Sequence, residues 1–134
     1  MSSSAVGPVP RVLVVDADAR TRESLTGVLG IGGRLVVVGS AGDVVSAASL
    51  AEDLRPDIIV VDPRLPELDR GRALIRRLRA AAPTCRILVM NGAAAAPEGW
   101  TPIDADAYVR KTFRANELVD AVLAAGRPTA SYPR

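Results

Sequence analysis

The sequence predicts one α/β domain with a parallel sheet of five strands. Short runs of Val, Ile and Leu occur four times, a fifth and weaker strand pattern follows at 105–110, and segments of helical length separate most of these strands. The run at 58–61 is uninterrupted, as expected of a strand that is covered on both faces. It ends in Asp62 followed by Pro63, which has no N–H to continue a ladder. Ligands of open α/β sheets bind at such carboxyl ends, so a functional site is expected there.

Composition excludes several classes of function. The chain has 134 residues, enough for one domain with a single core. One cysteine and no histidine exclude an internal disulfide, a cysteine zinc cluster and histidine catalysis. No apolar run has the length of a membrane span, and the start is not a secretion signal, so a cytoplasmic location is expected. A net charge of +2 is too small to indicate nucleic acid.

The first half of the chain contains two strand and helix pairs. Residues 11–16 form a strand that ends in a carboxylate, and Asp18 is the expected N-cap of a helix over 19–29. A second strand over 34–39 precedes a helix over 43–54. Glycines at 30, 32 and 33 end the first helix. The apolar faces are Leu25, Val28 and Leu29 in the first helix, and Val44, Ala47, Ala48 and Ala51 in the second.

The second half continues this alternation. After the loop 63–69, a helix over 70–82 precedes a strand over 86–90, and a short strand over 105–110 precedes a last helix over 114–125. Their buried faces are expected to contain Leu74, Ile75, Leu78, Leu118, Val119, Val122 and Leu123.

One segment does not fit the pattern. Residues 92–104 read GAAAAPEGWTPID, whose prolines and glycines leave room for about one turn of helix. The fourth helix is therefore expected to be short, irregular or absent. We expect the domain to span 11–126, with a flexible tail over 1–10 and a second tail over 127–134.

Polar side chains stand at the ends of four strands. They are Asp16, Asp62, Asn91 and Lys111, the single lysine of a chain that otherwise uses arginine. Since parallel strands end at one edge, two carboxylates, an amide and an ammonium are expected to share one crevice.

The motifs around these strand ends resemble those of a known protein family. VLVVD, PDIIVVDPRLP, RILVMNG and AYVRKTF resemble the receiver domain of bacterial two-component response regulators, over residues 11–126. Residues 34–62, followed by RALIRRLRAAAP at 72–83, look most like receivers of regulators that carry a helix-turn-helix. The resemblance implies a flavodoxin-like, doubly wound five-stranded parallel sheet of order 2-1-3-4-5.

The resemblance also implies roles. Asp62 is the expected acceptor of a phosphoryl group from a histidine kinase, with Lys111 beside it to neutralise developing charge. Asn91 stands at the position of the switch residue. The Mg²⁺ ligands implied are Asp16, Asp62 and the backbone carbonyl of Arg64.

Three residues depart from the family pattern. Ala17 stands where the second acid binds Mg²⁺ directly, so binding of the ion is expected to be weak. Asp18 is expected at the helix cap rather than at the metal. Asn91 replaces a Ser or Thr, and Thr112 replaces the proline after the lysine, so a trans Lys111–Thr112 bond is expected.

Three further features have two interpretations each. Arg64 either lies over the crevice in place of the metal or is solvated on its loop. The arginines of the third helix face either an acidic partner or solvent, with solvent favoured. Trp100 either anchors a partner or packs against the sheet.

Three classes of function remain open. An atypical stand-alone receiver would act by protein interaction, with impaired or absent Mg²⁺-dependent phosphorylation; a conventional one would be switched by a histidine kinase at Asp62. An enzyme is disfavoured because the strand ends offer no nucleophile with a general base beside it. A flavodoxin-like cofactor binder is disfavoured because no phosphate-binding loop follows the first strand. The expected partner is either a histidine kinase or a constitutively bound protein, and a homodimer is also open. No membrane association is expected, and nucleic-acid binding is not expected without an effector domain.

Overall fold

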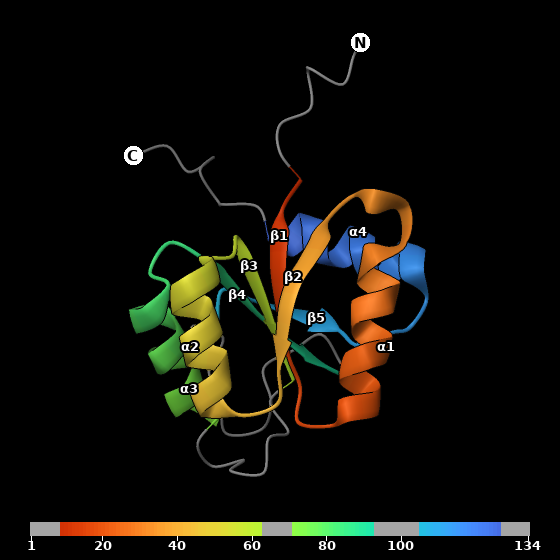
Figure 1. The fold of residues 1–134 in the computed structure, drawn as a ribbon. Helices are drawn as coiled ribbons and strands as arrows, with labels where there is room; N and C mark the ends of the chain where they lie inside the picture. The colour runs from red at the N-terminus through yellow and green to blue at the C-terminus, as the bar shows by residue number, and fades with distance from the viewer. Residues whose placement is uncertain (1–8, 63–70, 93–104, 127–134) are drawn as a thin grey trace.

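A computed structural model describes residues 9–62, 71–92 and 105–126. Its sheet has five strands, all parallel, in the order β2-β1-β3-β4-β5. Figure 1 shows α1 and α4 on one face of the sheet and α2 and α3 on the other. The predicted doubly wound sheet and its strand order are confirmed.

The element bounds lie close to the predicted ones. The strands are β1 (Arg11–Val15), β2 (Val36–Ala41), β3 (Ile58–Val61), β4 (Arg86–Asn91) and β5 (Ala107–Arg110). The helices are α1 (Ala19–Gly30), the 3-10 turn η2 (Ile31–Gly33), α2 (Val44–Leu54), α3 (Gly71–Ala81) and α4 (Ala115–Ala125).

The second strand differs most from its prediction. It was expected at 34–39, whereas β2 begins at Val36 and ends at Ala41. Because β2 is an edge strand, pairing with β1 alone sets its bounds. Val36 pairs with Arg11 and Ala41 with Val15. The strand keeps its predicted length of six residues but is shifted by two positions, which carries its end to the same edge at which β1 and β3 end.

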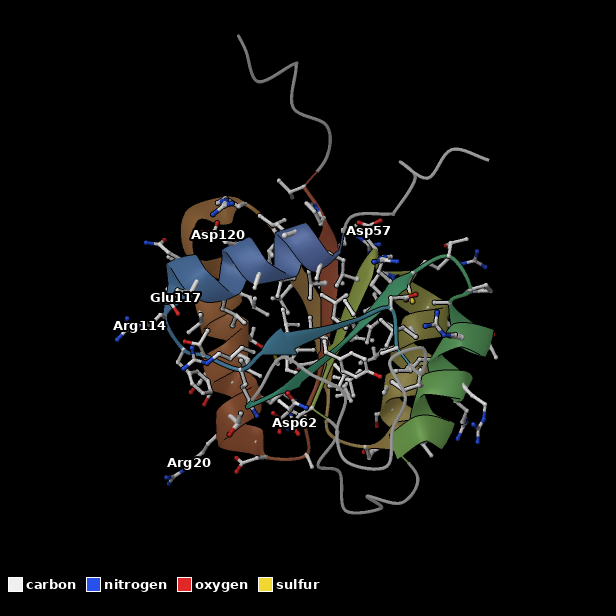
Figure 2. The ribbon with its side chains drawn as sticks, turned by 180° about the vertical axis from the view of Figure 1, so that it is seen from behind. Arg20, Asp57, Asp62, Arg114, Glu117 and Asp120 are labelled. Atoms are coloured by element: carbon white, nitrogen blue, oxygen red, sulfur yellow. The ribbon has the colours of Figure 1, made fainter. Side chains whose placement is uncertain are left out.

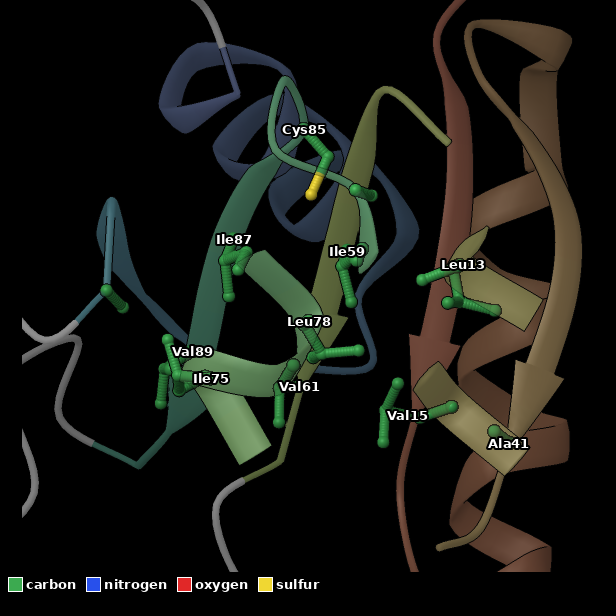
Figure 3. Close-up of a cluster of buried hydrophobic side chains, with 14 residues drawn as sticks. Leu13, Val15, Ala41, Ile59, Val61, Ile75, Leu78, Cys85, Ile87 and Val89 are labelled. Carbon is green, nitrogen blue, oxygen red and sulfur yellow. The ribbon is translucent and has the colours of Figure 1, made fainter. Parts of the chain in front are cut away.

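The core consists of two layers, one on each face of the sheet. Alternate residues of a strand enter opposite layers, so that Leu13 and Val15 face α2 and α3 while Val12 and Val14 face α1 and α4. Figure 3 shows the first layer, where side chains of β3 and β4 pack against Ile75 and Leu78. The helix positions named above lie in or against these layers, except Ala48, which is half-buried, and Leu74, whose side chain lies outside the described part of the structure.

Carboxylates cap two helices at the functional edge. The Asp18 side chain accepts hydrogen bonds from the backbone N–H groups of Arg20 and Thr21, which confirms the predicted cap of α1. Asp43 caps α2 in the same way through Ser46. Hydrogen bonds from the Ser46 backbone and hydroxyl hold the pKa of Asp43 below its ordinary value.

A glycine beyond α4 permits a close contact with the sheet. A Cβ atom at Gly126 would lie 2.5 Å from Cδ1 of buried Ile58 and 2.9 Å from the Val122 carbonyl oxygen. We expect Gly126→Ala to lower the free energy of unfolding by about 1–3 kcal/mol in urea denaturation. Gly27→Ala is the matched control, because a Cβ atom there meets nothing within 4 Å; in a helix interior it should stabilise by about 0.5–1 kcal/mol. Equal effects of the two changes would contradict this packing.

Burial is expected to lower the reactivity of the single thiol. Cys85 is 5% exposed, and burial, assisted by the charge of Asp106, raises its pKa from 9.0 to about 11. The folded state thus retains the thiol proton more strongly; its stabilising contribution is complete below pH 9 and is lost as the pH rises toward 11. Since the higher pKa lowers the thiolate fraction, we expect disulfide-exchange labelling at pH 8 to be about a hundredfold slower in native protein than in urea. Similar rates in both states would contradict the placement of this thiol.

Some expectations concern residues outside the described ranges. They are the tails 1–8 and 127–134 and the fourth helix within 92–104, of which only Gly92 is described. In the described ranges, no helix has the length and apolarity needed to cross a membrane.

Candidate functional site

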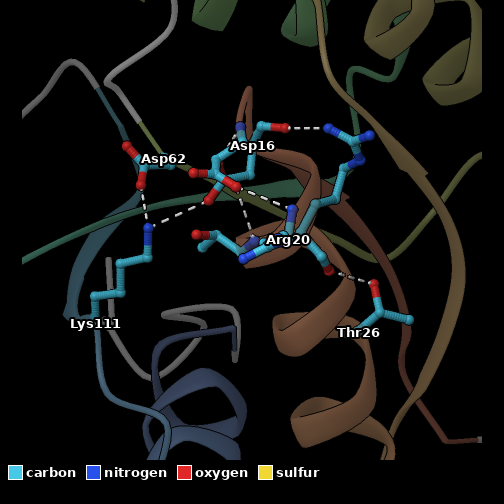
Figure 4. Close-up of polar contacts among 8 residues, drawn as sticks. Asp16, Arg20, Thr26, Asp62 and Lys111 are labelled. Carbon is cyan, nitrogen blue, oxygen red and sulfur yellow. Dashed lines mark hydrogen bonds and ion pairs between the residues drawn. The ribbon is translucent and has the colours of Figure 1, made fainter.

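Two buried carboxylates and one ammonium meet at the carboxyl edge of the sheet. Asp16 follows β1, Asp62 follows β3 and Lys111 follows β5. The Lys111 Nζ atom lies 3.2 Å from Oδ2 of Asp16 and also forms an ion pair with Oδ2 of Asp62. Figure 4 shows the ammonium between the two carboxylates. The side chains are only 4%, 3% and 11% exposed for Asp16, Asp62 and Lys111, so water screens their charges weakly.

Main-chain ladders bring these side chains together. The N–H of Asp16 donates to the Ala41 carbonyl and the N–H of Asp62 donates to the Val15 carbonyl, which extends both ladders by one residue. The N–H of Lys111 donates to the Asn91 carbonyl at 2.7 Å. Strand register therefore decides which polar residues meet. Figure 2 shows Asp62 inside the end of the sheet, while Arg20 and Arg114 point outward.

Each of the four polar atoms of Asp16 has a partner within the protein. Its N–H is bonded to Ala41, and its carbonyl oxygen accepts from Nη1 of Arg22 at 2.6 Å. Its Oδ1 accepts from the Asp18 N–H at 2.9 Å, and its Oδ2 receives the Lys111 ammonium. Protein groups thus orient the Asp16 carboxylate and partly neutralise its charge.

Two adjoining hollows open at this edge. One of about 390 Å³ is lined by Asp16, Ala17, Asp18, Thr21 and Asp62. The other, of about 360 Å³, is lined by Thr21, Asp62, Asn91, Gly92, Lys111 and Phe113. Because Asp62 and Thr21 line both, a group bound at Asp62 would have access to either side. The four strand-end residues predicted to share a crevice all border these hollows.

The amide at the switch position lies in the second hollow. Asn91 is the last residue of β4, and the loop after β5 passes beside it through the Lys111 hydrogen bond. The described residues contain no cis peptide bond, so Lys111–Thr112 is trans as expected. The amide of Asn91 could donate to an anion at Asp62, although its shape differs from that of a hydroxyl.

The residues at this site could supply only a few of the ligands that Mg²⁺ requires. Asp16 and Asp62 offer carboxylate oxygens, whereas Ala17 offers none. Asp18 is engaged in capping α1, and no group of three or more acidic, His or Cys residues that could hold a metal occurs in the described part of the chain. Mg²⁺ accepts one or two carboxylates when waters and phosphate oxygens complete its octahedron, so a weakly held ion is compatible with these residues.

Sequence reasoning missed four residues of this site. Thr21 and Phe113 line the hollows, Arg22 contacts the Asp16 main chain, and Gly42 lies against Arg22. Thr21 follows Asp18 by three positions on α1, so helical spacing could have indicated it. No sequence signal indicates the other three, since their roles depend on packing between loops.

Several expected site features lie outside the described residues. They are the Arg64 carbonyl and side chain, Trp100, and Arg70 at the start of the basic helix. Their roles stay predictions. In α3, Arg76 and Arg77 are exposed, whereas Arg79 is half-buried and forms an ion pair with Asp106. The side chain of Arg72 is not described, and whether this face meets solvent or an acidic partner stays a prediction.

Comparison with known proteins agrees with this geometry. The family model described as response regulator receiver domain matches residues 12–123. The response regulator MprA of Mycobacterium sp. (strain KMS) is 37% identical over 122 residues, which are 90% of this chain and 52% of that protein. The chain thus spans about half the length of the curated relatives that it matches.

Solved receiver structures share the fold. The response regulator domain of Thermotoga maritima CheB has a TM-score of 0.72 at 29% identity, covering 89% of this chain and 97% of that one. The signal receiver domain of the putative response regulator NarL from Mycobacterium tuberculosis has a TM-score of 0.72 at 27% identity, covering 88% and 96%. From the strand-end residues, the sheet order and these matches, we conclude that the chain belongs to the response regulator receiver domain family of two-component signalling.

Proposed function

We propose that this receiver domain acts mainly by binding a protein partner, and that Mg²⁺-dependent phosphorylation at Asp62 is impaired. The observation that carries the proposal is the state of Asp16. All four of its polar atoms have protein partners, and the neighbouring position is Ala17. A site with two carboxylates and the Lys111 ammonium has a net charge of −1, so it attracts a divalent cation less strongly than a site with a third acid does.

The metal and the ammonium have overlapping roles in this proposal. When bound, Mg²⁺ would be held by Asp16 and Asp62 and would neutralise charge on phosphoryl oxygens. Lys111 already lies between the same two carboxylates. Asp16 and Asp62 would therefore share their negative charge between the ammonium and the ion, and this competition would lower the affinity for Mg²⁺.

A second candidate function rests on a different observation. Asp62 is buried beside an ammonium, which is the charge arrangement that a phosphoryl-accepting carboxylate needs. In this case an Asp62 carboxylate oxygen forms the bond to phosphorus, and the donor leaves with its electron pair. The partner would be a histidine kinase, and this receiver domain would be a conventional phosphorylation switch.

Intact mass distinguishes the two. The protein is incubated with a small-molecule phosphodonor and excess Mg²⁺, beside an Asp62→Asn control. Under the proposal, the wild type acquires no phosphoryl increment or only a trace. A near-stoichiometric increment that the control lacks would overturn the proposal in favour of the conventional switch, and the search would turn to a kinase.

A further inference from the structure

Arg22 connects the site to a second loop. This residue of α1 donates through Nη1 to the Asp16 carbonyl oxygen at 2.6 Å. Its guanidinium also lies against Gly42, in the loop between β2 and α2, where a Cβ atom would be 2.6 Å from Nη1 and 3.3 Å from Cζ. Glycine at position 42 thus provides the space that the guanidinium occupies. The charge of Arg22 also helps to lower the pKa of Asp43, which places it beside this loop.

The hydrogen bond from Arg22 holds the main chain just beyond the end of β1. β1 ends at Val15, so the Asp16 carbonyl is not part of a described ladder, and Arg22 is its hydrogen-bond partner. Beyond that point the orientation of Asp16 depends on this bond, on the Asp18 N–H and on Lys111. Without Arg22, the peptide unit after Asp16 would lose this anchor. The Asp18 N–H, which lies one peptide further on and orients Oδ1 of Asp16, would then be held less firmly.

We propose that Arg22, seated on Gly42, is a positioning residue that holds the Asp16 carboxylate against Lys111. The inference deepens the proposed function and rests on it, since it treats Asp16 and Lys111 as one site. Its test measures the reactivity of the Lys111 amine and needs no phosphorylation. The positioning role of Arg22 and the proposed function can therefore fail independently of each other.

The single lysine is the reporter. A brief pulse of an amine-acylating reagent on the folded protein modifies Lys111 only when its ammonium leaves the carboxylates, and peptide mass analysis of the lysine-containing fragment gives the rate. We expect Arg22→Gln to raise this rate about fivefold, the factor that one typical hydrogen bond contributes to an equilibrium. Gly42→Ala should do the same, because its methyl group displaces the guanidinium while the arginine keeps its charge. Arg20→Gln is the matched control: Arg20 is exposed on the same helix and points outward (Figure 2).

Two further readings separate positioning from general destabilisation. The rates should not change as urea is raised to just below the unfolding transition, since the opening is local. The Arg22→Gln/Gly42→Ala double variant should be no faster than either single variant, because both changes break one contact.

Three results would overturn the inference. The first is wild-type rates in folded Arg22→Gln and Gly42→Ala proteins. The second is an effect of Arg22→Gln without one of Gly42→Ala, which would indicate charge and not contact. The third is a rate that rises steeply with urea. If Arg22→Gln does not fold, Gly42→Ala decides on its own.

Discussion

Ala17→Asp is expected to raise the affinity of the site for Mg²⁺ on the order of tenfold or more. Ala17 lines the hollow that Asp16 and Asp62 border, so a carboxylate there would add a third oxygen donor beside two buried ones. The net charge of the cluster changes from −1, with two carboxylates and Lys111, to −2, and this favours a divalent cation. Calorimetric or NMR titration with MgCl₂ measures the change.

The same substitution should restore phosphorylation if the missing acid is what impairs it. In the intact-mass experiment, Ala17→Asp should acquire a phosphoryl increment that Ala17→Asp/Asp62→Asn lacks. Ala17→Asn is the matched control, because it has nearly the same shape as Asp without the charge. An Ala17→Asp variant that binds Mg²⁺ tightly and still takes no phosphoryl group would move the cause to Asn91 or Thr112. One that binds no better than Ala17→Asn would contradict the metal argument.

Lys111→Met is expected to lower the free energy of unfolding by about 3–5 kcal/mol at neutral pH. The side chain pairs with Asp16 and Asp62, which are 4% and 3% exposed, and its removal leaves two buried carboxylates without their shared cation. Breaking a buried ion pair from one side costs more than the pair contributes, because the remaining charges stay desolvated. Urea denaturation followed by circular dichroism gives the value.

A double variant tests whether that loss comes from charge. Lys111→Met/Asp62→Asn has one buried carboxylate fewer, so it should be more stable than Lys111→Met. Lys111→Arg keeps the positive charge and should lose much less than Lys111→Met. If Lys111→Met matched the wild type in stability, the ammonium would not be holding the carboxylates together.

Local patterns made most of the fold predictable. The apolar runs at β1 and β3 indicate buried parallel strands because each lacks the alternation of a half-exposed strand. Asp18 and Asp43 start helices through hydrogen bonds to residues two or three positions away, so the amino-acid order reveals them. The least accurate bounds are those of β2, because an edge strand takes its ends from its partner.

The sequence by itself determined which chemical groups stand at the strand ends: two carboxylates, an amide and the only lysine, with alanine in place of a second acid. It could do so because a strand and the residue that follows it are neighbours along the chain. Only the tertiary structure decided how these groups are paired. Lys111 and Asp16 are 95 positions apart, and the register of three successive strand pairings, from β1 to β5, places their side chains 3.2 Å apart. The contact of Arg22 with Gly42 likewise depends on how α1 packs beside the end of β2. No local sequence pattern encodes this packing, because the two residues belong to different elements.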